Sequence, residues 1–256
     1  MSTQYADHSA PSGLRTRGTV VVVPGRGEVP ASYGRFGARL AADAYRVRVL
    51  PPPEIDRDDV SGALDRLAGS LTEAVAGIAD MVRPLVLVGA DIGAAALGAL
   101  VARPDPTKAA WWPQAVVLAA PPGYEARQLG GWDDELDART HCPVHRGVLT
   151  DDPTVQPGSL AASVPAELLD AAYGNTSDLP HLLLVGDTDP LAGQAELARL
   201  AKSLPSARLS IVRGAHHDVL NDLQHRAVAA EIVSFLEAVR GAPPLVPVVA
   251  VEASSW

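Results

Sequence analysis

Three ionisable residues, Asp91, Asp189 and His217, each follow an apolar run of this sequence that predicts a buried strand. If the strands are parallel, their carboxyl ends meet at one edge of a sheet, which is where open α/β sheets place their ligands. We therefore expect the three side chains to lie close together. A carboxylate, an imidazole and a second carboxylate can act as nucleophile, base and orienting acid.

The turn that carries Asp91 has a distinctive spacing. The apolar run 85–88 is followed by Gly89-Ala90-Asp91-Ile92-Gly93 and then by small residues that predict a helix to about Ala102. This spacing is typical of a nucleophile elbow, a sharp strand-to-helix turn that lifts one side chain above the sheet. Glycines suit the flanks because side chains there would collide with the neighbouring strand and helix. The central residue of such turns is usually Ser, and here it is Asp91.

Composition restricts the classes of function. The chain has 256 residues, of which 47% are hydrophobic, and this suits one large α/β domain with a sizeable core. A formal net charge of −9 gives no reason to expect nucleic acid or an anionic membrane as a partner. The single cysteine excludes an intramolecular disulfide. No apolar run is long enough to span a bilayer, and the first 18 residues carry no secretory apolar segment, so we expect a soluble cytoplasmic protein.

Buried strands alternate with amphipathic helices along most of the chain, which predicts a parallel sheet covered on both faces. The predicted strands are 19–23, 45–50, 85–88, 115–120, 181–186 and 207–212. The predicted helices are 33–42, 60–81, 92–102, 192–203 and 221–240.

The same pattern divides the chain. Residues 1–18 are expected to form a flexible leader, and 19–240 a single domain. The alternation of strands and helices is interrupted at about 121–180. This stretch is rich in Gly, Pro and Asp, and we interpret it as a small lid insertion. Residues 241–256 form a Pro-rich apolar tail to which no role is assigned.

From about 19 to 240 the chain resembles an α/β-hydrolase. The stretch Pro24-Gly25-Arg26-Gly27-Glu28, followed by Tyr33, is similar to the His-Gly-x-Gly-Glu…Tyr opening of the monoacylglycerol lipase and lysophospholipase branch. The stretch Gly214-Ala215-His216-His217-Asp218 resembles the Gly-Ala-Arg-His-Glu segment of that branch. The chain order nucleophile, acid, histidine is also the order of this fold.

The resemblance assigns roles within a catalytic triad. It makes His217 the catalytic histidine and His216 its neighbour, the latter interpreted as a loop or substrate-side contact. In the acid loop the Asp just before Pro190 is the orienting carboxylate, so Asp189 is preferred over Asp187.

The resemblance also implies an oxyanion hole formed by the backbone N–H groups of Arg26 and Ile92. Pro24 stands where the branch usually has His, which is compatible with a backbone donor. The Arg26 side chain, if it lies near the pocket, could bind a substrate carboxylate.

Asp91 departs from the lipase pattern. Attack by a carboxylate on an acyl carbon would give an anhydride, and its charge opposes a developing oxyanion. A carboxylate suits displacement at a saturated carbon, which forms an alkyl ester that a His-activated water then hydrolyses. Epoxide hydrolases and haloalkane dehalogenases, which share this fold, use Asp in this way. The resemblance thus implies that Asp91 attacks carbon and that His217, oriented by Asp189, activates water.

A small apolar substrate is expected, with an epoxide ahead of an alkyl halide. Dehalogenases commonly have Trp directly after the nucleophile, and epoxide hydrolases often do, whereas here Ile92 stands there, which counts against both. Epoxide hydrolases need lid phenols to protonate the opening oxygen. Tyr173, in the expected lid, and Tyr124, at its edge, are the candidates for binding substrate in this way.

Three alternatives remain open: a lipase-like carboxylic ester hydrolase, an enzyme in which Asp91 is a general base, and an inactive pseudo-hydrolase that only binds ligand. No cofactor is implied. The segment His141-Cys142-Pro143-Val144-His145 lacks the usual spacing of structural zinc ligands, so we expect no metal site there.

Overall fold

The computed structural model describes residues 5–103, 109–125, 127–241 and 245–249. These residues form a seven-stranded sheet in the order β1-β3-β2-β4-β5-β6-β7. All neighbouring strands are parallel except β1, which runs antiparallel to β3 at the edge. The bounds are β1 Ala6–His8, β2 Gly18–Val23, β3 Tyr45–Val49, β4 Leu85–Ala90, β5 Ala115–Ala119, β6 His181–Gly186 and β7 Ala207–Val212. The predicted, mostly parallel sheet is confirmed.

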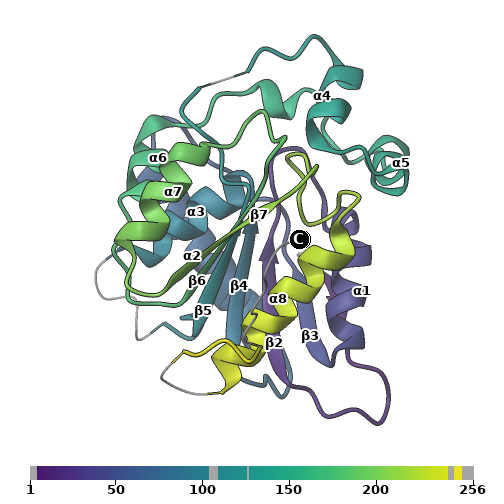
Figure 1. Cartoon of the computed structure of the whole chain (residues 1–256), viewed down its shortest axis with the longest axis vertical. Coiled ribbons are helices and arrows are strands. Elements are labelled where there is room, and N and C mark those ends of the chain that lie inside the picture. The colour runs from purple at the N-terminus through teal and green to yellow at the C-terminus, as the bar shows by residue number, and fades with distance from the viewer. Residues whose placement is uncertain (1–4, 104–108, 126, 242–244, 250–256) are drawn as a thin grey trace, which may run out of the picture.

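Helices cover both faces of this sheet (Figure 1). Alternate side chains of β2 point to opposite faces, so Val21 and Val23 pack with α2, α3, α6 and α7, whereas Val20 and Val22 pack with α1 and α8. The bounds are α1 Gly34–Ala42, α2 Val60–Ala76, α3 Ile92–Val101, α4 Trp132–Arg139, α5 Pro143–Asp151, α6 Ala166–Tyr173, α7 Gln194–Ser203 and α8 His225–Arg240, with short 3-10 turns η1 Pro30–Tyr33 and η2 Ser159–Ala161. Among the described residues, no helix combines the length and apolarity needed to cross a membrane.

The expectation of a flexible leader over 1–18 is wrong for its described part. Ala6–His8 form β1, in which Ala6 pairs with Val49 of β3. An ion pair between Arg48 and Asp7, at 2.6 Å, ties this strand to the sheet. The strand is short and has no apolar run, so hydrophobic patterning could not reveal it.

The expected lid at about 121–180 divides into two parts. Helix α6 packs on α3, and its Leu168, Leu169 and Ala172 are buried in the main core. Helices α4 and α5 lie together at one end of the sheet (Figure 1). We call these two helices and the following segment 152–165, which contains η2, the cap. Of the predicted tail at 241–256, residues 242–244 and 250–256 lie outside the described part of the chain. Helix α2 ends at Ala76, before the predicted end at 81, because Gly77 closes its last turn.

Candidate functional site

Asp91 occupies a sharp turn between β4 and α3. Its backbone has φ 48° and ψ −122°, a conformation that side-chain-bearing residues rarely adopt. The flanking glycines permit a close approach: a Cβ on Gly93 would lie 2.4 Å from the carbonyl oxygen of Val23, and one on Gly89 would lie 2.6 Å from Cα of Ala94. The turn thus holds a buried carboxylate at the carboxyl end of the sheet.

The structure brings the three sequence-predicted catalytic side chains together. Nδ1 of His217 lies 2.9 Å from Oδ2 of Asp189, and Nε2 of His217 lies 3.1 Å from Oδ1 of Asp91. The Nε2 contact lacks hydrogen-bond alignment, so it is an ion-pair contact in this state. The backbone N–H groups of Leu191 and Ala192 donate to Asp189 at 2.8 and 3.2 Å and fix its orientation.

The charges of these groups depend on one another. Burial alone would raise the pKa of Asp91, but Arg26 and His217 outweigh it and hold that pKa well below its usual range. Burial would lower the pKa of His217, but the carboxylates of Asp189 and Asp91 outweigh it and raise that pKa to about 10. The charged forms of Asp91 and His217 therefore stabilise each other.

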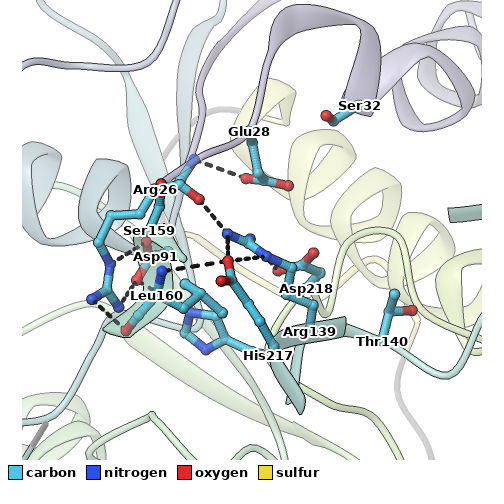
Figure 2. A network of polar contacts seen from close by, with 12 residues as sticks. Arg26, Glu28, Ser32, Asp91, Arg139, Thr140, Ser159, Leu160, His217 and Asp218 are labelled. Carbon is cyan, nitrogen blue, oxygen red and sulfur yellow. Dashed lines mark hydrogen bonds and ion pairs between the residues drawn. The ribbon is translucent and has the colours of Figure 1, made fainter. Parts of the chain in front are cut away.

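Arg26 binds Asp91 through both its backbone and its side chain (Figure 2). Its backbone N–H and its Nε each donate to Oδ2 at 2.8 Å, and Nη2 donates to Oδ1 at 2.7 Å. Nη1 donates to the carbonyl oxygens of Leu160, at 3.2 Å, and Ala162 in the cap. The backbone N–H that was predicted to serve the oxyanion hole is therefore occupied by the elbow carboxylate itself.

A cavity of about 650 Å³ lies beside this pair. It is open to solvent on one side and is lined by residues 25–29, 51–55, Arg57 and Ile92 and by several residues between 154 and 165. Asp91 and His217 do not line this cavity. They border a separate void of only about 10 Å³, so the Arg26 side chain lies between the cavity and the carboxylate that it binds.

The two predicted phenols lie elsewhere. The hydroxyl of Tyr173 donates to the carbonyl oxygen of Pro122 at 2.9 Å, and that of Tyr124 donates to Asp170 at 2.7 Å. Their rings pack against each other at 6.0 Å. Neither residue lines the cavity beside Arg26, so the structure does not bring these phenols to Asp91.

His216 also points away from the cavity. Its Nδ1 lies 2.9 Å from Asp222, and its ring stacks on His141 with centroids 3.8 Å apart. Cys142 is buried, and its Sγ accepts a hydrogen bond from Arg35. The side chains of the 141–145 segment thus face different partners.

A buried ionic network, which the sequence did not reveal, connects α4 to the loop that carries Arg26 and to the loop that carries His217 (Figure 2). Arg139 is 1% exposed, and its Nη2 donates to the carbonyl oxygen of Arg26 at 2.6 Å and to Glu135 at 2.8 Å. Its Nη1 lies 3.5 Å from Asp218. The only sequence signal is the i, i+4 spacing of Glu135 and Arg139, which is ordinary for an exposed helix.

Backbone hydrogen bonds strengthen the same connection. The N–H of His217 donates to the carbonyl oxygen of Ala138 at 3.1 Å, and that of Asp218 donates to Arg139 at 2.8 Å. The end of α4 therefore positions both the loop that carries Arg26 and the loop that carries His217.

One corner of this network has the composition of a metal site. Ligand atoms of Glu28, His145 and Asp218 lie within 4.8 Å of one another. The cation there is Arg139, which helps to hold the pKa of Asp218 below its usual value although burial alone would raise it. Glu28 already accepts from the N–H of Gly25 at 2.8 Å. The arrangement fits an internally neutralised ion network better than a metal centre.

Comparisons with known proteins locate the fold. No protein-family model matches the sequence, and a search of curated proteins finds no match. Among solved structures, a soluble variant of monoglyceride lipase from Saccharomyces cerevisiae matches with 16% identity and a TM-score of 0.68, covering 92% of this chain and 91% of that one.

Two further structures agree. Monoacylglycerol lipase from Paleococcus ferrophilus matches with 19% identity and a TM-score of 0.68, covering 93% of this chain and 100% of that one. A carboxylesterase from Bacillus subtilis matches with 13% identity and a TM-score of 0.63, covering 92% of each chain. At these identities the likeness establishes architecture, and the chain has the α/β-hydrolase fold that its sequence predicts.

Proposed function

We propose that this protein is a small-molecule hydrolase in which Asp91, His217 and Asp189 form the catalytic group. The observation that carries the proposal is their arrangement: Asp91 on the elbow, 3.1 Å from Nε2 of His217, whose Nδ1 lies 2.9 Å from Asp189. The similar solved structures are named as lipases and a carboxylesterase, which supports a hydrolase.

The first proposed step is displacement at a saturated carbon of an epoxide. Oδ2 of Asp91 accepts the backbone N–H of Arg26, and Oδ1, beside Nε2 of His217, is the attacking atom once Nη2 of Arg26 releases it. As the Oδ1–carbon bond forms, the epoxide C–O bond breaks, and the released oxygen takes the proton of the His217 imidazolium. This imidazolium can supply the proton that was expected to come from the hydroxyl group of Tyr173 or Tyr124.

The second proposed step hydrolyses the ester. Neutral His217 takes a proton from water, and the resulting hydroxide attacks the carbonyl carbon of the Asp91 ester. The oxyanion forms at Oδ2, which already accepts the N–H of Arg26, and the N–H of Ile92 stays the expected second donor. Collapse regenerates the Asp91 carboxylate, and the hydroxyl proton of the intermediate passes to the departing alkoxide. The products are a diol and the starting state with protonated His217.

This proton cycle favours an epoxide over an alkyl halide. Opening an epoxide needs one proton, which protonated His217 holds at neutral pH. Loss of a halide needs none, so His217 would first have to release its proton to solvent. Ile92, at the position that commonly carries Trp in dehalogenases, also offers no ring N–H to a halide.

Two other functions each rest on one observation. The names of the similar structures favour a carboxylic ester hydrolase, in which Asp91 and His217 would activate water directly. The ion pair that covers Asp91 favours a ligand-binding protein without turnover.

The deciding experiment is intact mass spectrometry of His217→Gln after incubation with 1,2-epoxyhexane or 1-bromohexane. The bromide is included because its displacement needs no proton. An added alkyl group that maps to Asp91, and that is absent from the Asp91→Asn, His217→Gln double variant, supports the proposal. If wild-type protein hydrolyses esters and no adduct forms, the ester hydrolase replaces it. Binding without any turnover or adduct indicates the ligand-binding protein.

A further inference from the structure

We propose that the cavity beside Arg26 takes a small organic carboxylate with an apolar body, and that Arg57 binds its anionic end. This inference rests on the proposed function for the meaning of the cavity, and it names the class of substrate. It starts from two guanidinium groups, those of Arg26 and Arg57, that line the same cavity.

Both arginines reach the same segment of the cap region. Nη1 of Arg26 donates to the carbonyl oxygens of Leu160 and Ala162, and Nη2 of Arg57 donates to that of Ser163 at 3.1 Å. Two cations therefore bind the segment 160–163, of which Ala162 and Ser163 line the cavity.

The two cations differ in whether their charge is already neutralised. Arg26 is paired with Asp91. Arg57 has no ion-pair partner among the described residues, and the bond to Ser163 is its only hydrogen bond there. A guanidinium carries five N–H donors, so most of those on Arg57 are free to bind a ligand. A ligand carboxylate forms stronger, charge-assisted bonds than the neutral Ser163 carbonyl and can replace it.

Two carboxylates, those of Glu28 and Glu54, also line the cavity. Glu28 is directed into the buried network by hydrogen bonds from the N–H of Gly25 and the hydroxyl of Tyr33. Glu54 is exposed and has neither a hydrogen bond nor an ion pair among the described side chains. Its charge opposes a bound anion, so removal of that charge should strengthen binding.

The rest of the lining is mixed. Apolar side chains line the cavity, among them Val29, Pro51, Ile55, Ile92 and Pro165, and so do the polar side chains of Thr154, Gln156, Ser159 and Ser163. The apolar part suits a short hydrocarbon body. A cavity of about 650 Å³ accommodates a molecule of several carbons. The ligand that fits this lining is amphipathic, with one charged end.

The test measures binding of hexanoate and its neutral analogue hexanamide by isothermal titration calorimetry. Wild-type protein should bind hexanoate more tightly. Arg57→Gln should weaken hexanoate binding by about fivefold or more while leaving hexanamide unchanged, and Glu54→Gln should strengthen it by about twofold. Arg46→Gln is the matched control, because Arg46 is another arginine that donates to a backbone carbonyl, that of Ala79, but it does not line the cavity. Equal affinity for the two ligands, or no effect of Arg57→Gln, would overturn the inference.

Turnover separates this inference from the proposed function. With 5,6-epoxyhexanoate and its methyl ester as substrates, Arg57→Gln should raise KM for the anion and leave kcat nearly unchanged. If hexanoate binds through Arg57 but no epoxide is opened, the proposed function fails and the anion site stands. If neutral and anionic epoxides are opened equally well by both proteins, the anion site fails and the proposed function stands.

Discussion

Arg26 and Asp91 are joined at three points. The backbone N–H and Nε of Arg26 converge on Oδ2, and Nη2 binds Oδ1. The backbone contact leaves Oδ2 where the oxyanion of a later ester cleavage would lie, whereas the side-chain contact covers Oδ1. For Oδ1 to attack a substrate, the Arg26 side chain must release it.

Replacing Arg26 by Gln should therefore both destabilise the protein and expose the carboxylate. Loss of one partner of this buried pair is expected to lower the free energy of unfolding by about 3 kcal/mol, measured by urea denaturation. In the His217→Gln background, alkylation of Asp91 by 1-bromohexane should become about tenfold faster, because Oδ1 no longer has to leave the guanidinium. A tenfold increase corresponds to an activation free energy lower by about 1.4 kcal/mol. Slower alkylation would show that Arg26 assists the nucleophile. Arg103→Gln, which breaks an exposed pair with Asp65, is the control for stability.

Asp189 should matter far more to turnover than its neighbour Asp187. Asp189 holds Nδ1 of His217, whereas Asp187 accepts the N–H of Gly214 at 2.6 Å and, among the described residues, makes no hydrogen bond to the imidazole. Asp189→Asn removes the negative charge that orients the His217 ring and raises its pKa. We therefore expect kcat to fall by about a hundredfold or more. Asp187→Asn should leave kcat within about twofold. Equal losses in the two variants would contradict the assignment of the orienting acid.

The protonation of His217 predicts how stability depends on pH. Its pKa is about 10 in the folded protein, against 6.5 for an unperturbed imidazole. A raised pKa stabilises the folded state fully below pH 6.5, and that contribution is lost as the pH rises toward 10. The difference in the free energy of unfolding between wild type and His217→Gln should therefore shrink between about pH 7 and pH 10. Urea denaturation across this range measures it, and a constant difference would mean that His217 is neutral in the folded protein.

Arg139 should be a positioning residue with a large effect on stability. Arg139→Met leaves Glu135 and Asp218 buried without their shared cation, which should cost about 3–5 kcal/mol. Arg139→Lys keeps the charge but loses the planar guanidinium that binds several acceptors at once. Compared with Arg139→Met, it should therefore recover part of the lost stability and a smaller part of the lost kcat. The control, Arg146→Gln, breaks a more exposed pair with Asp137 and should cost at most about 1 kcal/mol. A loss of stability without a change in kcat for the Lys variant would contradict the positioning role.

The sheet and the elbow could be predicted because their sequences are unambiguous. The run 85–88 is apolar throughout, and two glycines bracket Asp91 at the spacing that a close strand-to-helix packing requires. The ends of parallel strands then bring Asp189 and His217 toward Asp91 without any knowledge of side-chain geometry.

Elements without an apolar signature could not be predicted in the same way. Ala6–His8 join the sheet through backbone pairing and the Asp7–Arg48 ion pair, neither of which leaves a periodic pattern. A helical segment is expected near 165–172, and α6 spans Ala166–Tyr173, but it was interpreted as part of the lid. Only its packing on α3 assigns it to the core.

At the site, the directions of individual side chains could not be predicted from the sequence. Arg26 was predicted to act through its backbone, and the sequence has no signal that its guanidinium lies on Asp91. Tyr173 is in the expected region, but its hydroxyl donates to backbone carbonyls. Arg139 stands in a charged helix whose composition indicates exposure, whereas three carboxylates hold it in the interior.

The most direct test of covalent catalysis by Asp91 is turnover of a substrate epoxide in oxygen-18-labelled water. Because water attacks the carbonyl carbon of the enzyme ester, the heavy oxygen should enter the Asp91 carboxylate and appear in the peptide that contains it. The same peptide from Asp91→Asn should stay unlabelled. Product that carries the label from the first turnover, with an unlabelled Asp91, would contradict the covalent mechanism.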